Sequence, residues 1–148
     1  MFRFSLQRVL DYRRQLRERV EHEMGRIHSQ IEKEREELRS RRRELEQQNE
    51  ELNERGRSQS LNVLELSLIH TYIKAVRVHI SRHEYAITQH QDRLAQKRQE
   101  LIKASQREKA MEKLKERERR SYLETLARAE NSFLDEIAIR SHFHVNAD

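Results

Sequence analysis

The sequence predicts an all-α fold, an elongated antiparallel two-helix coiled-coil hairpin in which the second helix overhangs the first. Two observations predict it. The 148 residues are 39% charged, 34% hydrophobic and 5% aromatic, with two Gly and no Pro, so few residues are suited to turns. The hydrophobic residues nevertheless recur at heptad spacing, which separates this chain from a disordered one. We expect a single domain over residues 1–148.

The predicted second helix, at about residues 62–140, carries the clearest repeat. One row of side chains recurs every seven residues, and a second row follows it three residues later. Two such rows, sustained over several heptads, form the seam of a coiled coil. The rows are Leu66, Ile73, Ile80, Ile87, Leu94 and Leu101, and Ile69, Val76, His83, His90, Lys97, Ala104 and Met111.

The predicted first helix, at about residues 4–53, has a less regular stripe. A bend is expected near Gly25, which costs about 1 kcal/mol relative to Ala inside a helix. Polar residues alternate with apolar ones in its later part, so more than one register against the second helix is possible. The apolar positions are Leu6, Val9, Leu10, Leu16, Val20, Met24, Ile27, Ile31, Leu38, Leu45 and Leu52, and the polar ones are Glu34, Arg41 and Gln48.

A turn is expected at about residues 54–61, between the two stripes. Gly56 is a natural residue to follow the end of the first helix. Asn62 and Glu65 can form a capping box for the second helix, with a start at Ser60 as the alternative. Because the connection is short, the helices should be antiparallel neighbours.

The second helix is predicted to be longer than the first, so its last part has no partner within the hairpin. Apolar side chains on an unpaired helix tend to bind a partner. The tail at residues 141–148 is expected to fray. The apolar residues of the overhang are Tyr122, Leu123, Leu126, Phe133, Leu134, Ile137 and Ile139.

Charge argues against nucleic-acid binding. The formal charge is +5, from 31 basic and 26 acidic residues that alternate through most of the chain. Mixed signs at helical spacing are typical of a solvated face, whereas a nucleic-acid site needs basic residues segregated on one side. Without a signal peptide or an apolar span, we expect a soluble, cytoplasmic protein.

Catalytic and metal sites are not predicted either. A two-helix rod offers no concave cavity to exclude water and orient reacting groups, so we expect neither catalytic residues nor a cofactor. There is no Cys. His79 and His83 have the i,i+4 spacing of a chelating pair, but a zinc site needs further ligands. His83 and His90 instead fall in the seam, where a polar layer can set the register.

Three segments resemble the flagellar export protein FliJ family. Residues 2–13 read Phe-Arg-Phe-Ser-Leu-Gln-Arg-Val-Leu-Asp-Tyr-Arg, with the family's aromatic-x-aromatic, Leu-Gln and Val-Leu pairs followed by an Arg. Residues 109–117 read Lys-Ala-Met-Glu-Lys-Leu-Lys-Glu-Arg, and residues 134–140 read Leu-Asp-Glu-Ile-Ala-Ile-Arg. The order of these segments and the chain length strengthen the resemblance.

The resemblance implies a component of the flagellar type III export apparatus, at the cytoplasmic side of the inner membrane. Such proteins resemble the stalk of rotary ATPases: the terminal end binds the hexameric export ATPase, and the rod contacts the export gate and export chaperones. The candidate ring-binding residues are Phe4, Leu6, Arg8, Leu10, Arg13, Arg14, Lys113, Leu114, Arg117, Asp135, Glu136 and Arg140. The candidate gate-binding residues are Tyr72, Val76, His79 and His83. The alternative is a generic coiled-coil scaffold or chaperone adaptor without ATPase coupling.

Overall fold

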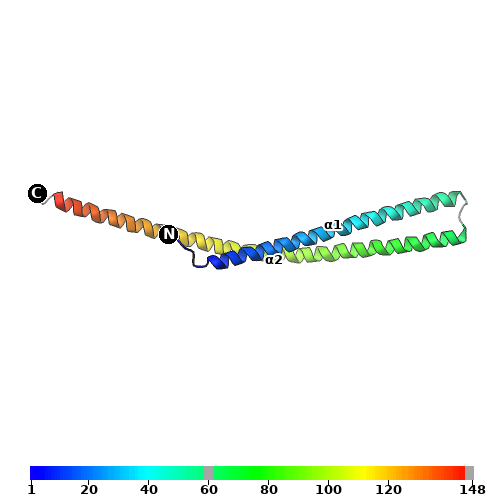
Figure 1. Ribbon diagram of the computed structural model, residues 1–148, viewed down its shortest axis with the longest axis horizontal. Coiled ribbons are helices and arrows are strands. Elements are labelled where there is room, and N and C mark those ends of the chain that lie inside the picture. Colours follow the sequence, from blue (N-terminus) through cyan, green and yellow to red (C-terminus); the bar gives the residue numbers. More distant parts are fainter. Residues whose placement is uncertain (59–61, 146–148) are drawn as a thin grey trace. The chain divides into compact units, whose positions relative to one another are not determined.

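The computed structural model describes residues 1–58 and 62–145, with the side chains of residues up to Ile139. It contains two long helices packed against each other, α1 (Gln7–Arg57) and α2 (Val63–Val145) (Figure 1). Residues 1–58 and 62–145 include no strand. The predicted all-α hairpin is therefore confirmed. Residues 59–61 of the expected turn and 146–148 of the expected tail lie outside the described residues.

Both helices end later than the sequence predicts, α1 at Arg57 and α2 at Val145. Gly56 lies inside α1, so the expectation that it follows the helix end is wrong. The Ser58 amide still donates a helical bond to the Glu54 carbonyl at 3.2 Å, and the Ser58 hydroxyl donates to the Arg55 carbonyl at 2.9 Å. These bonds satisfy the carbonyls of Glu54 and Arg55 in the last turn of α1. At the other end of the chain, residues 141–145 continue α2.

The start of α1 differs from the expected residue 4. Residues 1–4 are not helical, and α1 begins at Gln7. Phe4 is nevertheless 7% exposed, because the extended segment carries its ring into the apolar interior. α1 passes through Gly25 as one uninterrupted helix.

The predicted capping box at the start of α2 is confirmed. The Glu65 amide donates to the Asn62 side-chain oxygen at 2.8 Å, and the Asn62 amide donates to the Glu65 carboxylate at 3.5 Å. Two backbone donors that the first turn leaves unpaired are thereby satisfied. The helix therefore begins immediately after Asn62.

Replacing Asn62 by alanine should lower the free energy of unfolding by about 1 kcal/mol, because the Glu65 amide loses its acceptor. Asn62→Asp keeps an acceptor at the same place and should stay close to the wild type. Urea unfolding followed by circular dichroism compares the three proteins. Equal losses for both variants would contradict the capping role.

The helices form two compact units. Unit 1 comprises Met1–Glu18 and Ile102–Asp148, and unit 2 comprises Arg19–Leu101. Inside each unit the pairing is antiparallel, since partner numbers on α2 fall as those on α1 rise. The pairs are Gln7 with Lys115 and Arg17 with Glu108 in unit 1, and Glu23 with Lys97, Glu34 with His83 and Glu44 with Tyr72 in unit 2.

The seam follows the predicted rows closely. Its polar positions on both helices are half-buried, so the seam is a mixed rather than a purely apolar layer. Leu66 departs from the prediction and is 38% exposed. Leu66 lies near the end of the seam, where Leu52 is the last half-buried residue of α1. Leu6 and Val9 of the α1 stripe also depart from the prediction, since each is 39% exposed. The buried apolar side chains are Phe4, Leu10, Ile31, Leu38, Ile73, Val76 and Leu94.

Candidate functional site

Surfaces, rather than a cavity, are the candidate sites of this protein. The described residues hold no group of three or more His, Cys, Asp or Glu side chains placed to bind a metal ion. Within the same part of the chain, neither helix has a stretch long and apolar enough to cross a membrane. What the chain can offer a partner must therefore be read from the side chains along α1 and α2.

The N-terminal segment is anchored to α2 within unit 1. The Met1 amino group donates to the Tyr122 hydroxyl at 3.2 Å, and the Phe2 and Tyr122 rings lie 5.8 Å apart between centroids. The Lys115 ammonium donates to the Gln7 side-chain oxygen at 2.8 Å. Together with the buried Phe4, these contacts hold the segment along α2 as far as Tyr122.

An ion cluster joins the helices one turn further into unit 1. Glu108 is 8% exposed, and its carboxylate accepts from Arg17 at 2.6 Å and pairs with Arg14 at 3.3 Å. Arg14 also donates to Glu112 at 2.9 Å. This bond to Glu112, with help from the Glu112 and Glu108 charges, raises the pKa of Arg14 despite the desolvation that opposes it. Arg14 is therefore held against α2.

The surface around this paired segment is strongly basic. Residues 1–18 and 102–122 contain 13 Lys or Arg and six Asp or Glu. Two open grooves lie on it, and both present guanidinium and ammonium groups to solvent. The first is lined by Phe2, Arg3, Phe4, Gln7, Lys115 and Arg119, and the second by Lys113, Glu116, Arg117, Arg120, Ser121 and Glu124. We call residues 1–18 and 102–122 the basic segment.

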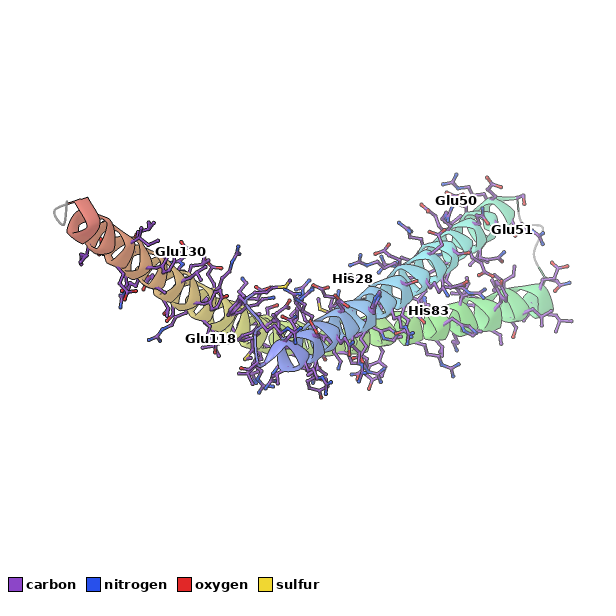
Figure 2. The ribbon with its side chains drawn as sticks, turned by 60° about the vertical axis from the view of Figure 1, so that its left-hand side comes forward. His28, Glu50, Glu51, His83, Glu118 and Glu130 are labelled. Atoms are coloured by element: carbon purple, nitrogen blue, oxygen red, sulfur yellow. The ribbon has the colours of Figure 1, made fainter. Side chains whose placement is uncertain are left out.

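The rest of α2 in unit 1 has the opposite character. All side chains at 123–139 are exposed, and the stretch holds four acidic residues against Arg128 alone (Glu130 is labelled in Figure 2). We call residues 123–139 the extension. Tyr122, which the sequence also predicts to be uncovered, is instead half-buried beside Phe2. The large apolar side chains of the extension lie between 44% and 63% exposed, as expected. They are Leu123, Leu126, Phe133, Leu134, Ile137 and Ile139.

The structure divides the predicted ring-binding residues by their accessibility. Phe4 and Leu10 are buried, and the half-buried residues are Arg13, Arg14 and Leu114. The exposed residues are Leu6, Arg8, Lys113 and Arg117 on the basic segment and Asp135 and Glu136 on the extension. The Arg140 side chain lies outside the described residues. The ring-binding residues predicted from the sequence did not include four basic residues that line the two grooves, Arg3, Lys115, Arg119 and Arg120. The i,i+4 spacing of Lys115 and Arg119 already places those two on one helix face.

The predicted gate-binding residues do not form one accessible face of unit 2. Val76 is 3% exposed, and the His83 ring nitrogen lies 2.6 Å from the Glu34 carboxylate within the seam (His83 is labelled in Figure 2). Tyr72 is 43% exposed and donates its hydroxyl to Glu44. His79 is exposed. Of the four predicted gate-binding residues, Tyr72 and His79 are therefore the two that a partner can reach.

A further polar layer in unit 2 also belongs to the seam. The Lys97 ammonium lies 2.7 Å from Glu100 and 2.8 Å from Glu23. These hydrogen bonds, to Glu100 first and then to Glu23, raise the pKa of Lys97, and the bond from Lys97 lowers the pKa of Glu23. Both groups thus keep their charges, and they fix one register rather than offer a binding site.

Comparison with the curated proteins and with the solved structures finds no match to this chain. A family model described as "Flagellar FliJ protein" matches residues 2–147, which is nearly the whole chain. The match confirms the resemblance to this family. The chain therefore belongs to the FliJ family of flagellar export components.

Proposed function

We propose that this protein is the coiled-coil stalk of the flagellar export apparatus and binds the hexameric export ATPase through unit 1. The observation that supports this most is the excess of positive charge on the basic segment, 13 basic against six acidic residues. An ATPase ring with an acidic lining would attract this segment and orient it on approach. The charge is carried on two paired helices, so little ordering is needed on binding.

The extension supplies the second half of the proposed contact. Its large apolar side chains are exposed, and burying them in the ring would add affinity that charge alone does not give. The export gate and the export chaperones are the further partners in this proposal. For the gate, Tyr72 and His79 are the residues that a partner can reach.

Reversing two exposed charges on the basic segment should abolish the ATPase contact. In Lys113→Glu/Arg117→Glu, like charges would face an acidic ring, and stimulation of ATP hydrolysis should fall roughly tenfold or more. The measurement is ATP hydrolysis and hexamer formation by the export ATPase of the same source, with and without each protein. Arg93→Glu/Arg98→Glu makes the same charge change at exposed positions of α2 in unit 2 and should stimulate like the wild type.

A chain ending at Tyr122 tests the extension separately. The shortened chain retains Tyr122 and Lys115, which hold the N-terminal segment, so the helices of unit 1 should stay paired. It loses the exposed apolar side chains of the extension. Reduced affinity for the ring is expected. If the full chain neither binds nor stimulates the ATPase, the alternative of a coiled-coil adaptor without ATPase coupling is favoured.

A further inference from the structure

A second apolar stripe runs along α2 in unit 2, on the side away from the seam. Leu64, Leu68, Val78 and Tyr85 are 70%, 63%, 50% and 67% exposed, and the small Ala75 between them is also exposed. We call these five residues the outer stripe. Large exposed apolar side chains that gather on one face mark a binding surface more often than scattered ones do.

The spacing of the outer stripe is that of a coiled-coil face. Positions 64, 68, 71, 75, 78, 82 and 85 alternate steps of four and three, and only Thr71 and Arg82 among them are polar. The seam positions Ile73 and Val76 are buried, so the outer stripe is a separate face of the same helix. A heptad-spaced face stays in line over several turns, which suits a partner helix lying along it.

The charges beside the outer stripe have one sign. Residues 66–83 contain no Asp or Glu, although the chain has 26 acidic residues. Lys74, Arg77 and Arg82 are exposed in this stretch, and none of them pairs with an acidic side chain in residues 1–58 or 62–139. Arg42 of α1, by contrast, pairs with Glu84 at 2.7 Å.

One opening on this face combines both features. A shallow hollow is lined by Arg77, Val78, Ser81, Arg82 and Tyr85. Two guanidinium groups beside an aromatic ring and an aliphatic side chain suit a carboxylate on an apolar helix, since arginine binds carboxylates through paired hydrogen bonds.

We propose that the outer stripe is a docking site for an amphipathic partner helix whose apolar side chains are flanked by Asp and Glu. A second copy docked through its own outer stripe does not fit, because the two faces would bring Lys74, Arg77 and Arg82 against the same cations. A lipid surface does not require the heptad spacing that the stripe keeps. The inference goes beyond the stalk function, because the stalk proposal assigns none of these residues to the ATPase or to the gate.

The test uses the full-length protein and a fluorescent synthetic helical peptide with leucine at its seam positions and glutamate on both flanks. A peptide with lysine on both flanks is the matched probe. Fluorescence anisotropy should give a dissociation constant at least roughly tenfold lower for the glutamate peptide. Leu68→Glu/Val78→Glu should weaken that binding by a similar factor, whereas Ser29→Glu/Gln47→Glu on the exposed face of α1 should leave it unchanged.

A second variant keeps the test decisive if the first one perturbs folding. Arg77→Gln/Arg82→Gln leaves the outer stripe intact and should reduce the preference for the glutamate peptide over the lysine peptide. Equal binding of the two peptides would overturn the proposal, as would unchanged binding by both variants. Binding to vesicles containing phosphatidylglycerol without binding to the peptide would also overturn it, in favour of a membrane surface. A dimer in sedimentation that Leu68→Glu/Val78→Glu abolishes would overturn it in favour of a second copy.

Discussion

Replacing Leu10 by alanine should lower the free energy of unfolding by about 2–4 kcal/mol. Leu10 is 0% exposed, and no larger side chain is fully buried in the part of the chain that the structure describes. Removing it deletes apolar contacts and leaves a cavity where two helices pack. Since a two-helix layer has few other buried side chains, the neighbours can compensate only by moving the helices together.

Urea unfolding and amide hydrogen exchange together measure this effect. Exchange should accelerate first in the amides of unit 1, because local opening there no longer breaks the Leu10 contacts. Leu6→Ala is the matched control: Leu6 is 39% exposed, and its truncation should cost well under half as much. Equal losses for Leu6→Ala and Leu10→Ala would show that this end of α1 is not packed against α2.

Features that depend on local spacing could be predicted from the sequence. The heptad rows place Ile73, Val76 and Leu94 in the seam, and the structure buries all three. The capping box of Asn62 and Glu65 needs only residues three apart. In both cases the helix geometry itself brings the side chains into place, so no long-range information is required.

The register between the helices could not be predicted in the same way. The seam of α1 is half polar, so apolar matching alone permits several alignments. In the structure the alignment places Glu23 opposite Lys97 in an ion pair, and it places Glu34 opposite His83 in a hydrogen bond of 2.6 Å. Because pairs of opposite charge are available at many offsets in this chain, their selection depends on the summed packing of both helices.

For two of the predicted gate-binding residues, the family resemblance and the heptad spacing gave different predictions: the first made them a partner surface, and the second placed them in the seam. Val76 and His83 fall in the second seam row by spacing, and the structure places them there, buried or half-buried. The outer stripe lies on the opposite side of the same turns, where Val78 and Tyr85 are exposed. Heptad phase separates the two faces from sequence alone, whereas the partner of each face depends on chemistry outside this chain.

Replacing Glu108 by alanine should destabilise unit 1 by about 1–3 kcal/mol, because its carboxylate is buried between two arginines. The bond from Arg17 is 2.6 Å long, and the side chain of Arg17 is 26% exposed, so water recovers only part of the lost interaction. Arg14 is 43% exposed and keeps Glu112, which limits the cost to less than that of a fully buried network.

Two further variants separate charge from packing at this cluster. Glu108→Gln keeps the size of the side chain but removes its charge, so a loss close to that of the alanine variant would assign the effect to the ion pairs. Glu112→Gln removes only the charge that faces Arg14 on the exposed side and should leave the urea midpoint nearly unchanged. A larger loss for Glu112→Gln than for Glu108→Gln would contradict the assignment of Glu108 as the group that ties α1 to α2 in unit 1.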